Sequence, residues 1–519
     1  MATHMVTHMH IHMDTHMSTQ FFNSMPNIRT IRIGFLNIPL LGPWLALYRL
    51  KKLFPLSVLK RHGYIVAKSG SGKSELLKQL LLVIKLGWRR WWPFPTIQRN
   101  KSFILLDPHG DVAKECAQQR FLYQDFQQSQ STGRTPDLIF ISPVLGKGKF
   151  PTLNPFDPCG RLYNSQEIEV LAQSLTGAFS AMLGKDDAQL SRHMRTLLVP
   201  MFAALLTLSR DSDRRATFFD LERFLDDDRN EDLIKFGREH LKSEGQRHFF
   251  AHLFPSARFK GTRFALRARL AGLLNAPMFV ELLARERSTW DLEGSMNAGK
   301  TIIISASRSD LGEEVSEIYG RTLTGLIQSY AFLRGRRARK NSRKTPTFLV
   351  IDEAARFVSP DIRTILAESR KFGLHLVLAN QIVKQGSISR EFQDTILGNT
   401  ALKVVGNAGD SSRKTMAREC ETKVDNFHGL PVGTFVVKAD MAKPVRVVLP
   451  KFWLGGKTTV TARQWQKICS YQLDQYYRDQ RSKKRIRTMG PEDQLMEEIN
   501  SSLIISGPLG SPRFGKPRP

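Results

Sequence analysis

Residues 64–82, YIVAKSGSGKSELLKQLLL, constrain the fold more than any other stretch of the sequence. A short apolar run, a glycine-rich turn and leucines at helical spacing follow one another, which predicts a strand, a phosphate-binding loop and a helix. The backbone N–H groups of such a turn form a concave anion site. The pattern G-x-x-x-x-G-K-[ST] is complete except that Ala67 stands at its first position. Because the strand should end there, the methyl group of Ala67 should be tolerated if its φ is negative.

The loop is the candidate site for a nucleotide. Gly70 and Gly72 permit the unusual backbone angles of such a turn. Lys73 would reach the β- and γ-phosphates, and the Ser74 hydroxyl would ligand Mg²⁺. A chance Gly-Lys-Ser turn is the alternative, and the flanking strand and helix speak against it. We therefore expect ATP and Mg²⁺ as cofactors, with the nucleotide bound by Ser69, Gly70, Ser71, Gly72, Lys73, Ser74 and Glu75.

Strands and helices alternate along the chain in two blocks. Apolar runs that end in polar residues, such as SFILLDPHGD, TIIISAS and LHLVLANQ, predict a mostly parallel central sheet covered by helices on both faces. GTFVVKAD and PVRVVLP predict a closing hairpin, and the stretch between the blocks has helical periodicity throughout. The predicted organisation is a His/Met-rich disordered tail (1–32), an apolar then basic segment (33–60), a first motor part (61–164), an all-helical inserted domain (165–292), a second motor part (293–450) and a C-terminal helix with a basic disordered tail (451–519).

A second set of candidate residues follows two of these strands. Asp352 and Glu353 come after the apolar run FLVI, and open parallel sheets bind ligands at that carboxyl edge. Asp352 would hold Mg²⁺, and Glu353 would accept a proton from an attacking water. Gln381 ends the next strand and would orient that water. A solvated strand end and a capping amide are the alternatives, which the nearby phosphate loop disfavours.

Arg370 ends the helix predicted between these two strands. Phosphoryl transfer needs positive charge near the γ-phosphate, and an arginine supplied for this purpose contributes roughly 10³–10⁵ in rate. An arginine at a helix C-terminus is also favourable for the helix alone. Position alone therefore favours a structural role for Arg370.

Six segments of the chain, in this order, resemble the HerA/FtsK superfamily: AKSGSGKSE, LLDPHGD, NPFDP, LVIDEAARF, AESRKFGLHLVLANQ and ILGNTALKVVGN. They are most similar to the conjugative coupling proteins of type IV secretion systems, the TraD/TraG/TrwB group. The resemblance implies a RecA-like P-loop NTPase fold with an inserted all-α domain, assembled as a hexameric ring that moves DNA through its pore using ATP. Arg370 matches the arginine that these proteins give in trans to the adjacent subunit, which reverses the preference from position.

The resemblance also implies roles for the other matching positions. Lys73 and Ser74 match the loop lysine and its magnesium hydroxyl. Asp352 and Glu353 match the acidic pair. Gln381 matches a strand-end glutamine whose strand lies, in this family, between the loop strand and the acidic strand. No motif of the family identifies the residues of a DNA channel in this sequence.

The N-terminal apolar segment bears on the location of the protein. Coupling proteins usually begin with a pair of membrane helices, whereas this chain offers residues 33–48, IGFLNIPLLGPWLALY. The segment is shorter than the ~20 residues that a spanning helix needs, and Pro39 and Pro43 interrupt it. We interpret it as strands or an interfacial segment and leave membrane contact open. Because the chain has only four cysteines, we expect a cytoplasmic location, with the inner face of the cell membrane as the alternative.

The net charge of +29 favours nucleic acid as the partner over an anionic membrane surface or a ribosomal contact. Basic runs lie at residues 258–269, at 333–344 and in the C-terminal tail, and each alone is more often a solvated surface. We expect DNA, further copies of the chain in a homo-hexamer, and relaxosome or secretion-channel proteins as partners. The candidate DNA contacts are Arg336, Arg337, Arg339 and Lys340.

The sequence therefore predicts an ATP-hydrolysing DNA translocase, a coupling-protein-like ATPase of conjugative DNA transfer. A type IV secretion ATPase that energises protein export or pilus assembly, and a HerA-like DNA-processing translocase, are the alternatives. A non-enzymatic DNA scaffold is a further alternative, and the complete set of hydrolytic residues argues against it.

Overall fold

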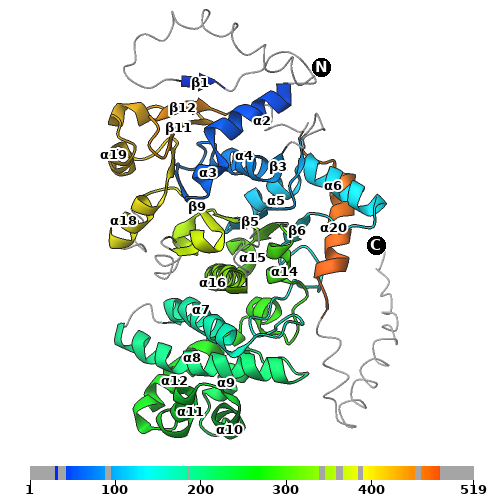
Figure 1. Ribbon diagram of the computed structural model, residues 1–519, viewed down its shortest axis with the longest axis vertical. Coiled ribbons are helices and arrows are strands. Elements are labelled where there is room, and N and C mark those ends of the chain that lie inside the picture. Colours follow the sequence, from blue (N-terminus) through cyan, green and yellow to red (C-terminus); the bar gives the residue numbers. More distant parts are fainter. Residues whose placement is uncertain are drawn as a thin grey trace, which may run out of the picture.

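The computed structural model describes residues 30–32, 42–87, 95–183, 188–337, 345–357, 366, 368–383, 390–449 and 458–479. A ten-stranded sheet runs through one half of the molecule, with the strand order β1-β12-β11-β10-β2-β9-β8-β5-β7-β6 (Figure 1). The β10–β11 and β11–β12 pairs are antiparallel, and the other pairs described in this sheet are parallel. The mostly parallel sheet and the closing hairpin predicted from the sequence are confirmed.

The strands of this sheet coincide with the apolar runs of the sequence. Runs of valine, isoleucine and leucine suit central parallel strands, because helices bury both of their faces. A separate two-stranded sheet joins β3 (Leu86–Gly87) to β4 (Thr96–Ile97). The strands of the large sheet are β1 (Thr30–Arg32), β2 (Gly63–Val66), β5 (Ser102–Asp107), β6 (Leu138–Ile141), β7 (Thr301–Ser305), β8 (Thr347–Ile351), β9 (Leu374–Asn380), β10 (Leu402–Val405), β11 (Thr434–Ala439) and β12 (Val445–Val448).

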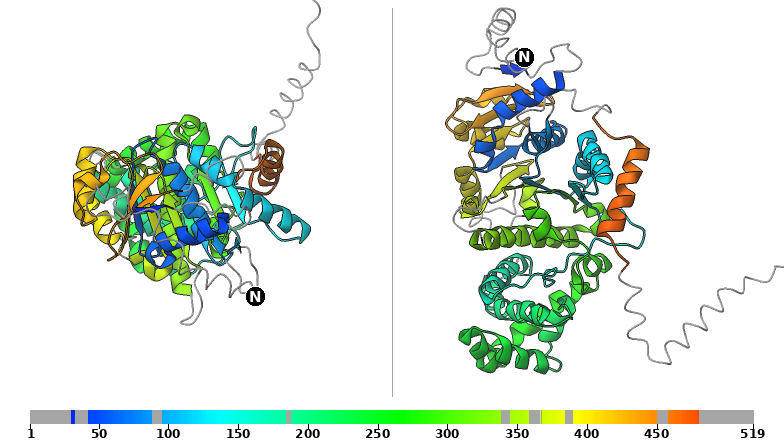
Figure 2. Two further views of the ribbon diagram at one scale, coloured as in Figure 1. Left: turned by 90° about the horizontal axis from the view of Figure 1, so that it is seen from above. Right: turned by 45° about the vertical axis from the view of Figure 1, so that its right-hand side comes forward.

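Helices cover both faces of the sheet (Figure 2). One apolar core joins the sheet to α2, α4, α5, α6 and α20, and the other joins it to α16, α18 and α19. The helices of this half are α2 (Gly42–Leu53), α3 (Leu56–Leu59), α4 (Lys73–Lys85), α5 (Asp111–Ala117), α6 (Arg120–Ser131), α15 (Arg308–Leu311), α16 (Glu313–Arg337), η3 (Ala354–Arg356), η4 (Ser369–Phe372), α18 (Arg390–Asn399), α19 (Asp410–Glu419), η5 (Val424–Phe427) and α20 (Ala462–Tyr476).

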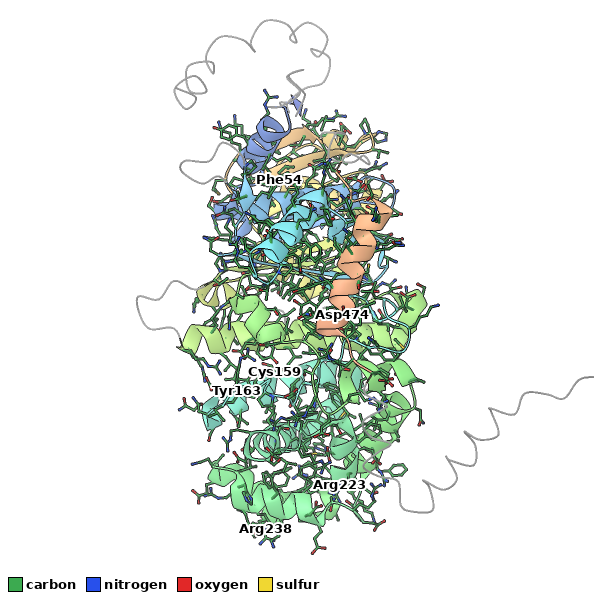
Figure 3. All side chains as sticks on the ribbon, turned by 90° about the vertical axis from the view of Figure 1, so that its right-hand side faces the viewer. Phe54, Cys159, Tyr163, Arg223, Arg238 and Asp474 are labelled. Atoms are coloured by element: carbon green, nitrogen blue, oxygen red, sulfur yellow. The ribbon has the colours of Figure 1, made fainter. Side chains whose placement is uncertain are left out.

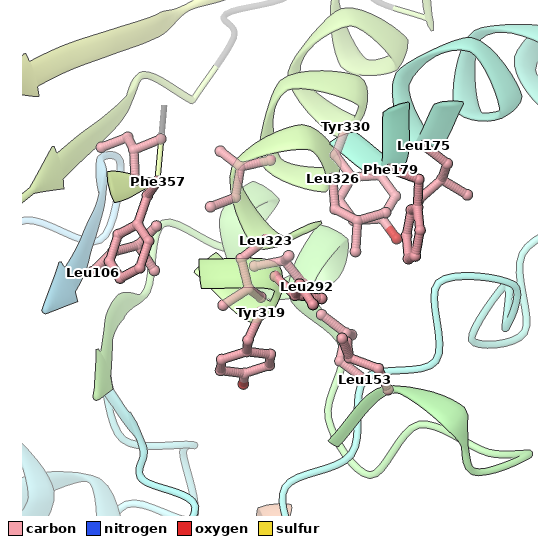
Figure 4. Close-up of a cluster of buried hydrophobic side chains, with 14 of the residues drawn as sticks. Leu106, Leu153, Leu175, Phe179, Leu292, Tyr319, Leu323, Leu326, Tyr330 and Phe357 are labelled. Carbon is pink, nitrogen blue, oxygen red and sulfur yellow. The ribbon is translucent and has the colours of Figure 1, made fainter. Parts of the chain in front are cut away.

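The other half of the molecule is a group of helices in the predicted insertion. The long helix α16 lies between this group and the sheet (Figure 2), and α7 packs along it. Leu323 and Leu326 of α16 meet Leu175 and Phe179 of the insertion in one continuous core (Figure 4). The elements are α7 (Ser165–Leu183), α8 (Ala188–Asp211), α9 (Phe218–Phe224), α10 (Glu231–His240), α11 (Glu244–His248), η1 (Phe249–Leu253), α12 (Ala257–Leu274), α13 (Pro277–Phe279) and η2 (Val280–Ala284). Helix α14 (Leu292–Asn297) follows them and lies at the sheet, in contact with β5 and α16.

The N-terminal segment differs from the prediction in two places. Residues 30–32, predicted as part of a disordered tail, form β1 and pair in parallel with β12. Residues 42–48, interpreted as strand or interfacial segment, belong to helix α2 instead, which packs on α4 through the buried side chains of Leu47 and Leu50. Pro43 does not prevent this helix, because a proline in the first turn removes an N–H group that has no partner inside the helix.

A helix that crosses a membrane must be both long and strongly apolar. No helix within the described residues meets both requirements. Residues 33–41 and the predicted tails at 1–29 and 480–519 lie outside the described residues. Most of the helix predicted before Gly373 does too, and its described end is the 3₁₀ helix η4, which Gly373 closes with a φ of 74°.

Helix α20 and the residue after it cover the sheet at its β6 edge. The Gln472 side chain accepts a hydrogen bond from the Phe140 N–H at 2.8 Å and donates one to the Leu138 carbonyl at 3.1 Å. The Tyr477 hydroxyl accepts from the Ser142 N–H at 2.8 Å and lies 3.1 Å from the Phe140 carbonyl. These side chains pair with the backbone groups that an edge strand would otherwise leave open.

Candidate nucleotide site

The glycine-rich loop has the backbone conformation that anion binding requires. It joins β2 to α4, and Gly70 and Gly72 have φ values of 74° and 96°. A side chain on Gly72 would come within 2.9 Å of the Gly433 nitrogen, so both space and conformation demand glycine there. The chain is exposed at Ser69 and Gly70, which leaves the mouth of the loop open.

Ala67 does not disturb this loop. It directly follows β2, is fully buried, and does not have a positive φ. Its backbone N–H donates a hydrogen bond to the Asn380 carbonyl at 3.1 Å. Gly406 lies opposite, and a Cβ atom on it would come within 2.9 Å of the Ala67 methyl group. The missing first glycine is thus matched by a glycine on the neighbouring strand segment.

The predicted lysine and acidic pair meet at the carboxyl edge of the sheet. The Lys73 ammonium lies 2.8 Å from Asp352 Oδ1 and 2.5 Å from Glu353 Oε1, and all three side chains are buried. Burial opposes the charge of Lys73, but the two carboxylates outweigh it and raise the lysine pKa. Glu353 has a φ of 47°, a left-handed conformation that is uncommon outside glycine and clusters at functional sites.

The remaining loop residues differ in their surroundings. Ser71 is buried, and its hydroxyl donates to the Lys68 carbonyl at 2.5 Å. Ser74 is half-buried in the first turn of α4. Glu75 accepts a hydrogen bond from Lys78 at 2.5 Å, and Lys78 also reaches Glu115 at 2.8 Å. Burial raises the pKa of Glu75 although Lys78 opposes the shift.

The oxygen donors of the site suit Mg²⁺. Hydroxyl and carboxylate oxygens are the ligands that this ion prefers, and it commonly keeps one or two carboxylates and several waters beside nucleotide phosphates. Ser74 and Asp352 supply such groups at the carboxyl edge of the sheet. Within the described residues, no group of three or more His, Cys, Asp or Glu side chains is placed to hold a metal ion.

Gln381 directly follows β9 and is half-buried. Strand β9 lies between β2 and β8 in the sheet, the position that the family resemblance implies for this glutamine. Its neighbour Asn380 was not predicted as a site residue. The Asn380 side chain accepts from the Ala355 N–H at 3.1 Å and donates to the Tyr64 hydroxyl at 3.3 Å, so it ties the turn after the acidic pair to the loop strand.

Asp107 is a second residue that the sequence analysis missed. It ends β5, next to β8, and accepts hydrogen bonds from the backbone N–H groups of His109 and Ala113, both at 2.9 Å. Burial raises its pKa, these hydrogen bonds oppose the shift, and the nearby Asp352 adds to it. The segment LLDPHGD marks this aspartate, because it ends a buried strand just as Asp352 does.

Arg370 lies away from this cluster. Its side chain is exposed, and its charge acts on His62, which precedes β2, and on His375, the second residue of β9. Both histidines stand at the amino ends of their strands, whereas Lys73 and the acids stand at the carboxyl ends. The structure therefore does not bring Arg370 to the nucleotide site of its own chain.

The candidate DNA contacts also lie outside the nucleotide site. Arg337 forms an ion pair with Glu167 and a second one with Glu293 at 2.7 Å. Arg336 is exposed at the end of α16. Arg339 and Lys340 lie outside the described residues.

Comparison with known proteins gives a family match and a shared fold. Residues 346–419 match the family described as the TraM recognition site of TraD and TraG. This segment contains the acidic pair, Arg370 and Gln381. Among curated proteins, none matches the sequence.

Three solved structures share the fold. The bacterial conjugative coupling protein TrwBdeltaN70, in its unbound monoclinic form, is similar with a TM-score of 0.53 and 16% identity over 76% of this chain and 86% of that one. The plasmid coupling protein TrwB in complex with ADP and Mg²⁺, and the same protein with a non-hydrolysable ATP analogue, each give a TM-score of 0.50 and 16% identity over the same shares. The predicted RecA-like fold with an all-α domain is confirmed, and the family match falls on the segment that carries the resemblance.

Proposed function

We propose that this chain is an ATP-hydrolysing motor that moves DNA, a coupling-protein-like ATPase of conjugative DNA transfer. The observation that carries the proposal is the buried contact of Lys73 with both Asp352 and Glu353 beside an open glycine-rich loop. A cation placed for phosphates, a carboxylate placed for a metal ion and a carboxylate placed for water are the parts that phosphoryl transfer to water needs. The likeness to TrwB structures solved with ADP and Mg²⁺ and with an ATP analogue supports the choice of cofactors.

In the proposed mechanism, the phosphates of ATP lie against the N-terminus of α4 and take the place of the carboxylates around Lys73. Ser74 and Asp352 would hold Mg²⁺, which supplies positive charge to the phosphate oxygens. Glu353, released from Lys73, accepts a proton from the attacking water, which Gln381 orients. Lys73 then stabilises the charge that develops on the transferred phosphoryl group.

The arginine of this mechanism would come from a neighbouring copy of the chain. Because Arg370 acts at the amino edge of the sheet and Lys73 at the carboxyl edge, one chain alone does not supply both groups to one nucleotide. We propose a homo-hexameric ring in which Arg370 of one subunit completes the site of the next. The test mixes Lys73→Ala and Arg370→Ala chains. Each variant alone should be inactive, and recovery of hydrolysis in the mixture would support a shared site.

The proposed cargo is DNA, and the proposed partners are relaxosomal or secretion-channel proteins. The net charge of +29 supports DNA, and the match to the TraM recognition site of TraD and TraG supports a relaxosomal partner. The proposed location is the cytoplasm, with the inner face of the cell membrane as the alternative.

The decisive experiment measures ATP hydrolysis without DNA, with single-stranded DNA and with duplex DNA, each at low and high salt. We expect DNA to stimulate hydrolysis and salt to weaken the stimulation. Lys73→Ala and Glu353→Gln should abolish the activity, whereas Glu231→Gln, at an exposed position in α10, should leave it unchanged. Hydrolysis that persists in the first two variants would contradict the assigned site. Hydrolysis that ignores DNA would instead favour a secretion ATPase for proteins.

A further inference from the structure

A second site lies between the insertion and the sheet half of the molecule. A cleft of about 520 Å³ is formed by one face of α16, by α7 and α8, by Phe357 after η3, and by Glu368 and Phe372 at the start and end of η4. Helices α7 and α16 lie next to each other along this boundary (Figure 1). None of the predicted nucleotide-site residues lines the cleft. Its lining consists of Val170, Gln173, Ser174, Thr176, Gly177, Arg195, Val199, Arg321, Thr324, Gly325, Gln328, Phe332, Arg336, Phe357, Glu368 and Phe372.

The cleft carries more positive than negative groups. Three lining residues are arginines, and Glu368 is the single carboxylate among the lining residues. Arg321 is fixed in place, because its guanidinium donates to Glu317 at 3.1 Å and to the Arg356 carbonyl at 3.2 Å. Arg336 is exposed and forms no ion pair within the part of the chain that the structure describes. A guanidinium of this kind is suited to a phosphate group.

Aromatic rings line the same cleft. Phe332 and Phe372 meet edge to face, with ring centroids 4.7 Å apart, and both are half-buried. Phe372 can lie this close to α16 because residue 335 is glycine, where a Cβ atom would come within 2.1 Å of the ring. A half-buried ring that lines an open cleft can stack on an unpaired base.

Two of the three arginines and one of the rings stand in one row along α16, whereas Arg195 comes from α8. The row consists of Arg321, Gln328, Phe332 and Arg336. Their spacings of seven, four and four residues correspond to one or two helical turns, so the four side chains face the same side of the helix. At a rise of 1.5 Å per residue, Arg321 and Arg336 are about 22 Å apart along the helix axis. The row of side chains is therefore longer than one nucleotide. Gln328 is 8% exposed and forms no hydrogen bond within the described residues, so its amide is available to the edge of a base.

We propose that this cleft binds successive nucleotides of single-stranded DNA, with Arg195 and Arg336 at phosphates and Phe332 against a base. The inference rests on the proposed motor function, because it names where the cargo contacts the motor. A duplex fits less well, since its bases are already stacked and paired and offer no face to Phe332. A free nucleotide presents the same chemistry as one unit of the strand, and the test separates these two sources.

The test measures binding of a fluorescent oligothymidylate to the full chain, without ATP, over a range of salt concentrations. Arg195→Gln together with Arg336→Gln should weaken binding about tenfold or more at low salt. Each lost phosphate contact on a single strand should also reduce the slope of log affinity against log salt by about 0.7. Phe332→Leu should weaken binding by about tenfold with an unchanged salt slope, because stacking releases no counterions.

The control is Arg238→Gln, which removes one exposed positive charge at the far end of the insertion (Figure 3). It should change binding less than twofold, because a distant surface charge is screened. Melting temperature is recorded for each variant, so that lost binding is not confused with lost folding. Competition by unlabelled AMP at millimolar concentration, with the salt slope unchanged, would assign the cleft to free nucleotide rather than to a strand.

The outcomes separate the cleft from the motor. If wild-type protein binds the oligomer and the Arg195/Arg336 variant binds equally well, the cleft proposal is wrong and the motor proposal stands. If both variants lose duplex and single-strand binding equally, the assignment to unpaired bases is wrong. If wild-type protein binds no DNA and its hydrolysis ignores DNA, the proposed motor function itself is refuted.

Discussion

Replacing Lys85 with methionine should destabilise the protein more than any surface substitution. Lys85 ends helix α4, the helix that begins at the phosphate loop, and its side chain is completely buried. Its ammonium donates to the carbonyls of Gly299 at 2.7 Å and Lys101 at 2.9 Å, and lies 3.1 Å from Asp137 Oδ1. Burial lowers the pKa of Lys85, although Asp137 opposes the shift.

The magnitude follows from what the substitution leaves behind. Methionine has a similar length and fills the space, so the loss is electrostatic rather than a cavity. The Asp137 carboxylate would still accept the hydrogen bond from the Thr301 hydroxyl at 2.5 Å. It would no longer have the Lys85 ammonium beside it, although it remains buried. Removing one partner of a buried ion pair typically costs about 3–5 kcal/mol, because the other charge remains uncompensated.

A double variant separates this cause from general damage. Lys85→Met with Asp137→Leu removes both charges and leaves only neutral groups without partners, for which the cost is about 1–3 kcal/mol. The double variant should therefore be more stable than Lys85→Met alone. Urea unfolding followed by circular dichroism measures both, with Lys114→Met, at an exposed position in α5, as the control within about 0.5 kcal/mol of wild type. A Lys85→Met variant as stable as the control, or a double variant less stable than the single one, would refute the reasoning.

Three further predictions concern the sheet and the loop. Burial lowers the pKa of His62 to about 3 and that of His375 to about 4, so both are neutral in the fold. Stability should be independent of them above about pH 6.5 and should fall below it, by up to about 1.4 kcal/mol per pH unit for each histidine. Urea titrations at several pH values check this, and His375→Asn should remove its share of the slope. Gln472→Leu should lower the free energy of unfolding by about 1–3 kcal/mol, because it leaves the Phe140 N–H and the Leu138 carbonyl without partners. An unchanged melting temperature in calorimetry would contradict this expectation. Gly72→Ala should weaken ATP binding at least tenfold, owing to its positive φ and the contact with Gly433; equal affinity in a nucleotide titration would contradict the loop geometry.

The central strands, and the residues that meet at the candidate nucleotide site, could be predicted from the sequence because their signals are local. An apolar run followed by Asp352 or Gln381 predicts which edge of a parallel sheet carries the polar groups. The N-terminal segment could not be predicted in the same way. Residues 30–32 contain one apolar residue between two polar ones, and they form β1 only because β12 offers an open edge more than four hundred positions away in the chain.

Asn380 and Asp107 were missed for a related reason. Each follows or ends a buried strand, as Asp352 does, so its position was visible in the sequence. The hydrogen bonds of Asn380 reach the turn after β8 and Tyr64 of β2, and the charge of Asp107 lies near that of Asp352 after β8. Both roles depend on strand order, a tertiary property that one sequence does not supply. The Arg337 ion pairs with Glu167 and Glu293 are likewise contacts between distant segments, and no local pattern distinguishes such an arginine from the exposed Arg336.

The separation of Lys73 and Arg370 on opposite edges of one sheet gives the proposed motor a physical reason to work as a ring. In the chain alone, Lys73 is neutralised by Asp352 and Glu353, so the carboxylate proposed to activate water is held in an ion pair. Phosphates that compete for Lys73 would release Glu353, because they offer the lysine the same sign of charge as the two carboxylates. Release prepares the water, but the developing charge still lacks an arginine from outside. We infer that two separate events control the site. Nucleotide binding releases Glu353, and the adjacent subunit supplies Arg370. Hydrolysis in one site should therefore depend on the position of the neighbouring subunit.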